Sequence, residues 1–143
     1  SGQVYMNGGR FEFGKMSLNS YYQVGRYGGA MAGSVEISGV HNLANLESAF
    51  SNSPTDISQV RLSNFGALSG SGWVDVGLAN QATGHVRATA NDWMRFGGDG
   101  STNAGRITNL GGTIEFGGDL TNQPSGFITG RGAFIAGNWN NHG

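Results

Sequence analysis

Two tryptophans that lie 20 residues apart are the side chains best suited to bind a ligand. Trp73 and Trp93 each come directly before an apolar–polar–apolar triplet, and alternation along a strand predicts that both indoles face outward. Stacked on one another, the indoles would form a flat apolar platform for a sugar ring or for another protein. The alternative is that the segment 43–59 covers both rings.

Charged residues recur at the same spacing and predict a ladder of charges on an outer face. Asp75, Arg95 and Glu115 each occupy the middle of a triplet, so Arg95 would lie between two carboxylates. A surface salt bridge and a carboxylate cluster that binds calcium both fit this pattern. Asp99 and Asp119 follow Gly-Gly pairs, where a plain turn and a calcium-binding turn are again the alternatives. No other cofactor is expected.

We expect no catalytic centre in this sequence. The chain has no cysteine, which excludes thiolate nucleophiles and thiolate metal sites. His41, His85 and His142 fall at different positions of the repeat, so they predict no ligand cluster. The segment 9–16 nearly matches a phosphate-binding loop, but Met16 replaces the hydroxyl residue that such a loop requires. The protein is therefore predicted not to be an enzyme.

These residues belong to a repeated unit, which is the strongest signal in the sequence. The unit contains an apolar–polar–apolar triplet that is followed within a few residues by glycine and then by asparagine. The triplets lie at 11–13, 35–37, 74–76, 94–96, 114–116 and 134–136. The asparagines form a predicted structural column of Asn19, Asn42, Asn80, Asn103, Asn122 and Asn141. Stacked amides of this kind can hydrogen-bond along the column.

Short strands joined by glycine turns predict an all-β fold, namely a parallel β-helix or solenoid. With three short strands per coil, we expect about six to seven coils of roughly 20 residues, in which each strand pairs with its counterpart one coil away. Glycine occurs 27 times and proline only 2 times, which fits frequent tight turns. Collagen is excluded because there is no Gly-X-Y period, and the many large apolar residues argue against disorder.

One segment interrupts the repeat. Leu43, Leu46 and Phe50 fall on one helical face, which predicts a short helical insertion near 43–53 that packs on a flank of the solenoid. The insertion as a whole is expected to cover 43–59. The chain, residues 1–143, is predicted to form a single solenoid domain.

Charge and hydropathy narrow the range of partners. The 8 basic and 9 acidic residues give a net charge of −1, without the basic surface that nucleic-acid binding requires. No apolar run approaches the roughly 20 residues that cross a membrane, so no membrane insertion is expected. The start at Ser1 rather than at a methionine predicts a processed protein or an excised fragment.

Both ends of the repeat lack a polar cap in the sequence, and this predicts self-association. A solenoid without caps exposes unpaired strand edges at each end. The residues expected at an end-to-end contact are Val4, Met6, Phe11, Phe13, Phe134 and Trp139. Stacking of copies into a filament and excision from a longer solenoid are the two explanations for such ends.

The repeats at 112–122 and 126–132 resemble the Gly/Asn-rich β-solenoid repeats of bacterial exported surface proteins, such as autotransporter-like passengers and PEP-CTERM-type proteins. The resemblance covers residues 60–143 well and 1–42 more loosely, and it brings no catalytic residues. It implies an extracellular or cell-surface location and a structural or adhesive role. We therefore expect a structural solenoid that forms a filament or part of a surface stalk. A glycan- or surface-binding adhesin is the alternative.

Overall fold

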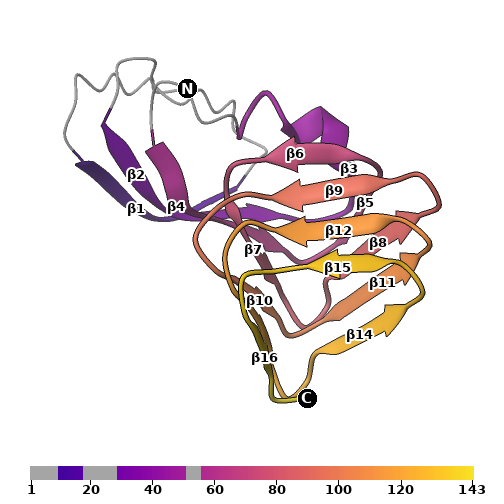
Figure 1. Ribbon diagram of the computed structural model, residues 1–143. Helices are drawn as coiled ribbons and strands as arrows, with labels where there is room; N and C mark the ends of the chain where they lie inside the picture. Colours follow the sequence, from indigo (N-terminus) through magenta and orange to yellow (C-terminus); the bar gives the residue numbers. More distant parts are fainter. Residues whose placement is uncertain (1–9, 18–28, 51–55) are drawn as a thin grey trace.

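The chain folds as an all-β solenoid of parallel strands. The computed structural model describes residues 10–17, 29–50 and 56–143. About six turns stack along one axis, which confirms the predicted fold (Figure 1). All strand pairings in the described ranges are parallel, and each strand pairs with its counterpart in a neighbouring turn.

Three sheets of described strands form the walls of the solenoid. Sheet A contains, in spatial order, β1 (Arg10–Ser17), β2 (Ala30–Ile37), β4 (Asp56–Asn64), β7 (Gly77–Asn80), β10 (Ser101–Asn103), β13 (Leu120–Asn122) and β16 (Trp139–Asn141). Sheet B contains β3 (Val40–Asn42), β5 (Ala67–Ser69), β8 (His85–Thr89), β11 (Arg106–Leu110) and β14 (Phe127–Gly130). Sheet C contains β6 (Gly72–Val74), β9 (Trp93–Phe96), β12 (Thr113–Phe116) and β15 (Ala133–Ile135).

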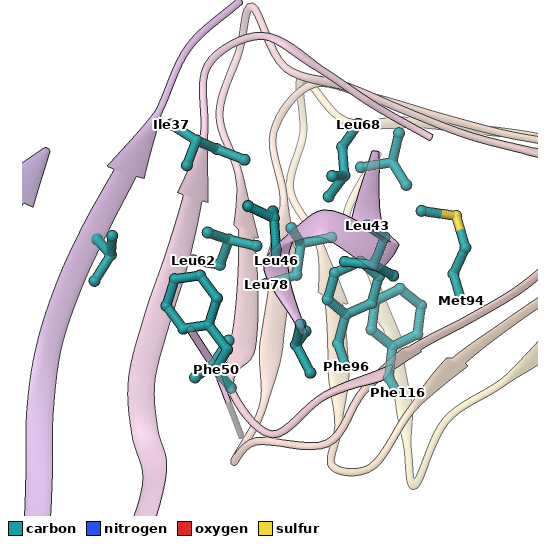
Figure 2. Close-up of a cluster of buried hydrophobic side chains, with 14 of the residues drawn as sticks. Ile37, Leu43, Leu46, Phe50, Leu62, Leu68, Leu78, Met94, Phe96 and Phe116 are labelled. Atoms are coloured by element: carbon teal, nitrogen blue, oxygen red, sulfur yellow. The ribbon is translucent and has the colours of Figure 1, made fainter. Parts of the chain in front are cut away.

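Residues 20 apart overlie one another in the C-terminal turns of sheet C, as predicted. Ile114 on β12 pairs with Met94 on β9, and Phe116 pairs with Phe96. The buried rings of Phe96 and Phe116 stack with their centroids 5.7 Å apart (Figure 2). The next turn keeps the spacing, because Phe134 on β15 pairs with Ile114.

The predicted spacing is wrong between β6 and β9. There Val74 pairs with Phe96 rather than with Met94, so the step is 96 − 74 = 22 residues. A shift of two residues leaves every side chain on its predicted face, because side chains alternate across a strand with a period of two. The repeat pattern therefore predicts inside and outside correctly without distinguishing these two registers.

A continuous apolar core fills the space between the three sheets. Leu62 and Leu78 enter it from sheet A, Leu68 enters from sheet B, and Met94 and Phe96 enter from sheet C (Figure 2). Each turn adds one layer of such side chains, and neighbouring layers lie one strand spacing apart, about 4.8 Å. Full burial of one large apolar side chain stabilises the fold by roughly 1.5–3 kcal/mol. The interior is therefore the main source of stability.

A short 3-10 helix, η1 (Leu43–Leu46), forms where the longer helix over 43–53 is predicted. The Asn42 side chain caps its start by accepting a hydrogen bond from the Ala44 N–H at 3.0 Å. The predicted apolar face is present and buried in the core, and its members are Leu43, Leu46 and Phe50.

The residues after η1 cover the outer edge of β6, which corrects two predictions (Figure 1). The Glu47 carboxylate accepts the backbone N–H of Trp73 at 2.7 Å. The Phe50 carbonyl accepts the backbone N–H of Asp75 at 2.9 Å. The segment thus lies across the end of sheet C rather than on a flank, and this end is covered rather than uncapped. An edge strand covered in this way is protected from pairing with another chain.

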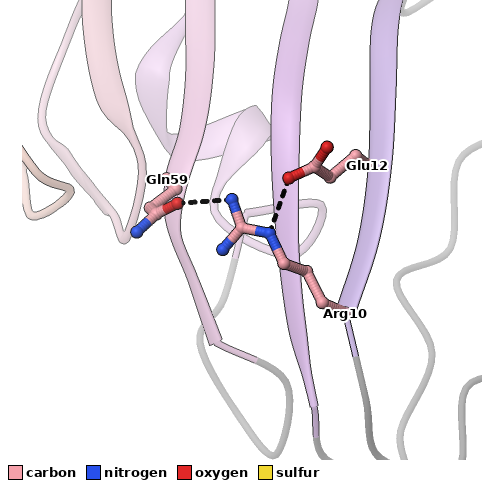
Figure 3. A network of polar contacts seen from close by, with 3 residues as sticks. All are labelled: Arg10, Glu12 and Gln59. Atoms are coloured by element: carbon pink, nitrogen blue, oxygen red, sulfur yellow. Dashed lines mark hydrogen bonds and ion pairs between the residues drawn. The ribbon is translucent and has the colours of Figure 1, made fainter.

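The N-terminal strands extend sheet A beyond the stacked turns (Figure 1). Arg10 on β1 reaches β4 across β2. Its Nε donates to Glu12 at 2.7 Å and its Nη2 donates to Gln59 at 2.8 Å (Figure 3). Because β4 begins at Asp56, the last residues of the predicted 43–59 insertion belong to sheet A instead.

The triplets at 11–13 and 35–37 also lie in sheet A, not above the triplets of sheet C as predicted. Phe11 pairs with Met31 on β2, and Val35 pairs with Leu62 on β4. Strands of both walls alternate apolar and polar residues, so similarity of triplets does not identify the wall to which a strand belongs.

Candidate functional site

The outer face of sheet C carries both candidate tryptophans. Trp73 on β6 is 53% exposed and Trp93 on β9 is 57% exposed, so the segment 43–59 leaves both indoles largely uncovered. The predicted stack of the two indoles is wrong, because the register places Arg95 beside Trp73. The two indoles instead occupy diagonal positions on neighbouring strands.

Trp73 forms a compact unit with charged neighbours. The guanidinium carbon of Arg95 lies 4.2 Å from the indole centroid, which is a cation–π distance. The indole Nε1–H donates to Asp75 Oδ1 at 3.0 Å. One ring face and the polar edge of Trp73 are therefore occupied within the chain, which leaves this residue less suited to a ligand than predicted.

The predicted charge ladder is present in part. Arg95 Nε lies 3.3 Å from Glu115 Oε1, and the two residues are register partners on β9 and β12. This contact is an ion pair without hydrogen-bond geometry, because the buried Nε–H finds no aligned acceptor among the described residues. Asp75 is not the register partner of Arg95, since Trp73 takes that position. A surface pair of this kind contributes about 0–1 kcal/mol.

Trp93 forms one wall of an open hollow with a volume of about 470 Å³. Its indole Nε1–H donates to Glu115 Oε2 at 3.2 Å. The residues around the hollow are Asn91, Asp92, Trp93, Gly111, Gly112, Thr113 and Ile135. An exposed aromatic face beside amide, carboxylate and hydroxyl groups is a combination that suits a sugar ring. Sequence reasoning identified Trp93 but missed its polar neighbours, which come from turns rather than from the triplets.

Asp92 is held at this hollow by the turn that follows β8. Its Oδ2 accepts the backbone N–H of Thr89 at 2.7 Å and the Thr89 hydroxyl at 2.8 Å. The preceding residue, Asn91, adopts a φ of 70°, a conformation that asparagine tolerates in tight turns. The backbone hydrogen bond from Thr89 is the largest of the effects that lower the pKa of Asp92 below its usual value of 3.8. The carboxylate is therefore ionised at neutral pH and available as an acceptor.

The acidic turns do not form a metal-ligand cluster in the described part of the chain, where no three His, Asp or Glu side chains converge. Asp119 Oδ1 accepts the backbone N–H of Asn138 at 3.0 Å and its side-chain amide at 2.9 Å. Asp99 is exposed on the turn one coil away. The contacts of Asp119 are those of a plain turn.

The histidines lie at separate positions. The His41 ring hydrogen-bonds to the Ser38 carbonyl at 2.8 Å, and the His85 ring hydrogen-bonds to the Thr108 hydroxyl at 3.1 Å. Although both histidines are on sheet B, they occupy different columns of it. His142 follows β16 and is exposed.

A buried ladder of asparagine amides runs along the corner after sheet A. Each Nδ2 donates to the Oδ1 of the next turn at 2.8–2.9 Å, and the members are Asn64, Asn80, Asn103, Asn122 and Asn141. Four of these residues belong to the predicted column. Asn64 was missed because it lies 80 − 64 = 16 residues before its neighbour rather than 20.

Asn42 is a correction to the predicted column, because it lies on β3 in sheet B and caps η1 instead. Asn19 lies outside the described residues. The signal that identifies Asn64 is its Asn-Phe-Gly sequence, since Gly66 follows it as Gly105 follows Asn103. Close approach selects glycine at these corners: a Cβ at Gly105 would overlap backbone oxygens of the previous turn.

The C-terminal end of the solenoid is open in the described chain. β14, β15 and β16 are the outermost strands of sheets B, C and A on this side. Three inward-pointing apolar side chains reach the surface there, and we call them the C-terminal end face: Ile128, Phe134 and Trp139. Their partners one turn inside are fully buried. The rings of Phe134 and Trp139 pack edge to face with centroids 5.9 Å apart.

The other predicted contact residues lie at the opposite end of sheet A. Phe11 and Phe13 are half-buried on β1, the outermost strand there, with ring centroids 6.0 Å apart. Val4 and Met6 lie outside the described residues. The residues that the structure describes are thus divided between the two ends, as an end-to-end contact requires.

No protein-family model matches the chain, and comparisons with curated proteins and with solved structures find no match. In the described ranges, no helix has the length and hydropathy needed to cross a bilayer. Functional inference for this protein therefore starts from its own surfaces, which are the outer faces of the sheets and the open end.

Proposed function

We propose that this protein is an extracellular structural solenoid, extended through its C-terminal end into a filament or a surface stalk. The observation that carries the proposal is the C-terminal end face, where the edges of three sheets surround apolar interior side chains. Exposed edges of this kind pair readily with further strands. The proposed role involves no catalysis.

Adding a further coil to this end would be favourable for two reasons. The side chains of Ile128, Phe134 and Trp139 would become fully buried, and complete burial of such a side chain is worth roughly 1.5–3 kcal/mol. The asparagine ladder would also continue. Asn141 accepts from Asn122 at 2.9 Å, and its own amide could donate to an added coil as the earlier ladder amides do.

The partner that we propose is a second copy of this chain. At the opposite end, β1 is the outermost strand of sheet A, with Phe11 and Phe13 on it. Pairing of β16 in one copy with β1 in the next would continue sheet A from copy to copy. Such a head-to-tail contact does not close on itself and generates fibres. Because the segment after η1 covers β6, sheet A rather than sheet C would carry the contact.

Sedimentation velocity and electron microscopy at increasing protein concentration test this proposal. We expect fibres or a concentration-dependent series of oligomers. Trp139→Lys should weaken assembly by about ten-fold or more, because a charge would be buried at the contact. The matched control is Leu110→Lys, which changes a partly exposed apolar residue in the middle of the solenoid. A protein that stays strictly monomeric at high concentration would overturn the contact between copies.

The extracellular or cell-surface location is part of the same proposal. Its support is the resemblance of the repeats at 112–122 and 126–132 to those of exported solenoid proteins. Antibody labelling of intact and permeabilised cells tests the location. Labelling that requires permeabilisation would contradict it.

A glycan-binding adhesin is the second candidate, and the hollow beside Trp93 favours it. The exposed indole would stack on a sugar ring, while Asn91 and Asp92 would bind its hydroxyl groups. On a glycan array, Trp93→Ala should abolish the signal of the wild-type protein. Trp73→Ala is the matched control and should retain binding, because Arg95 lies over that ring. Equal loss in both variants, or no signal from the wild type, would count against an adhesin.

A further inference from the structure

Sheet B has a basic outer face that neither proposed function uses. The outward positions of β8 and β11 include His85, Arg87, Arg106 and Thr108, and they alternate with buried residues. No aspartate or glutamate occurs on the strands of sheet B that the structure describes. Although the chain has a net charge of −1, positive charge is concentrated on this wall.

The two arginines of this face have no carboxylate partner in the described ranges. The ion pairs found there involve Arg10, Lys15 and Arg95 instead. Arg87 and Arg106 are both exposed. The guanidinium carbon of Arg106 lies 5.3 Å from the centroid of the Phe127 ring, its register partner on β14.

His85 shows that the positive groups act on one another. It is the register partner of Arg106, and Arg87 lies two residues further along the same strand. Burial lowers the pKa of His85 most, and the charges of Arg106 and Arg87 lower it further. The neighbouring positions are Ala67 on β5 and Thr108 on β11, so no carboxylate offsets these charges. An anion bound at this face would relieve the repulsion.

A hollow with a volume of about 340 Å³ adjoins these groups. Its lining residues are Ala82, Thr83, Gly84, His85, Gly105, Arg106, Ser125 and Phe127. Phe127 is 55% exposed and provides an aromatic wall, while the hydroxyls and the imidazole provide hydrogen-bonding groups. The corner glycines leave the hollow open because they carry no side chain.

We infer that this basic face of sheet B binds an acidic polysaccharide. Arg87 and Arg106 hold the carboxylate or sulphate groups of the sugar chain, and one sugar ring lies against Phe127 in the hollow. Arginine suits planar acidic groups because its guanidinium can donate two parallel hydrogen bonds. A nucleic-acid duplex fits less well, because its binding uses about 6–10 phosphate contacts and this face offers two arginines.

Titration calorimetry with three probes tests the inference on the protein as it exists. Polygalacturonate carries carboxylates, dextran sulphate carries sulphates, and unmodified dextran is the neutral control. We expect one or both acidic polymers to bind, with an affinity that falls as salt rises, and no binding of dextran. The stronger acidic probe identifies the acidic group. Equal binding of dextran, no binding of either acidic polymer, or tighter binding of duplex DNA would overturn the inference.

A matched pair of double variants locates the site. Arg87→Gln with Arg106→Gln should weaken binding of the acidic polymer by about ten-fold or more. Arg10→Gln with Lys15→Gln removes the same charge from sheet A and should leave binding unchanged. Circular dichroism of each variant verifies the fold. Equal weakening in both double variants would indicate a nonspecific charge effect and contradict a site on sheet B.

The pKa of His85 provides a readout that needs no variant. A bound anion adds negative charge beside the imidazolium, so binding should raise the pKa of His85, as followed by NMR titration. An unchanged pKa in the presence of saturating polymer would contradict binding at this face. Trp139→Lys leaves this face intact, so it should bind the polymer as the wild type does. Failure of the filament proposal and failure of this inference are thereby distinguishable.

Discussion

At the scale of single residues, Asn103 serves both of its neighbours in the ladder. It accepts from Asn80 at 2.8 Å, donates to Asn122 at 2.8 Å and is fully buried. A buried amide is tolerated when each polar group finds a partner, and an unpaired group costs its desolvation energy. A side chain at this position therefore needs both a donor and an acceptor.

Replacing Asn103 by alanine should lower the free energy of unfolding by about 2–4 kcal/mol, because an amide of Asn80 and a carbonyl of Asn122 each lose a partner. Equilibrium unfolding in urea measures this change. The matched control, Asn141→Ala, lies at the exposed end of the ladder and should cost under about 1 kcal/mol. Equal losses at the two positions would show that the ladder does not stabilise the interior.

Asp92 predicts a contribution to stability that depends on pH. Its pKa is lowered in the folded state, so its stabilisation is present above the usual value of 3.8 and is lost as the pH falls through the lower folded pKa. Asp92→Asn should therefore lose less stability than the wild type between about pH 5 and pH 2. Urea unfolding at several pH values measures the difference. Asp99→Asn makes the same charge change on an exposed turn, and an identical effect there would contradict a specific role of Asp92.

At the scale of elements, η1 and the residues after it act as a cap. A strand at the end of a sheet offers unpaired backbone groups, and Glu47 and Phe50 bind two of those on β6. The hydrophobic pattern of Leu43, Leu46 and Phe50 is that of a short amphipathic segment, and it fits the end of the interior as well as a flank. The cap makes the two ends of the solenoid different.

Removing the Glu47 carboxylate should loosen this cap. In Glu47→Ala, the backbone N–H of Trp73 loses its acceptor, so its hydrogen exchange should accelerate by about ten-fold, as the loss of a hydrogen bond worth roughly 1.5 kcal/mol implies. Hydrogen-exchange NMR of the Trp73 amide measures this rate. Glu47→Gln keeps a side-chain oxygen and should remain close to the wild type. An unchanged rate in the alanine variant would contradict the capping role.

At the scale of the whole molecule, each turn is stabilised chiefly by the turns above and below it. A turn in the middle has two neighbours, whereas the turn that contains β14 and β15 has one. Its interior side chains Ile128 and Phe134 are correspondingly less buried than those of the turns inside it. Stability is therefore expected to decrease toward the C-terminal end.

Amide exchange should reveal this gradient. Backbone amides of β14, β15 and β16 should exchange faster than those of β8, β9 and β10, because opening the last turn breaks pairings on one side only. Deuterium exchange with mass spectrometry at low protein concentration measures the order. The same amides should become protected at high concentration if copies stack. Uniform protection along the solenoid at low concentration would contradict an open end.

The sequence predicts more of the fold than of the sites. The triplet at 114–116 lies over that at 94–96, and four predicted asparagines occupy one ladder. The tryptophan stack fails because one extended corner shifts β6 by two residues against β9. The polar groups beside Trp93 were missed because they belong to turns, whose side chains follow no alternation.

By itself, the sequence determined the solenoid architecture, the inward and outward faces of its strands, and glycine and asparagine as corner residues. These properties follow from local alternation and local turn chemistry, which neighbouring residues specify. Only the tertiary structure decided the register between β6 and β9, the position of η1 across the end of sheet C, and the grouping of Arg87 and Arg106 around His85. Each of these depends on pairing between distant segments, and a slip of two residues changes such a pairing without altering the local pattern.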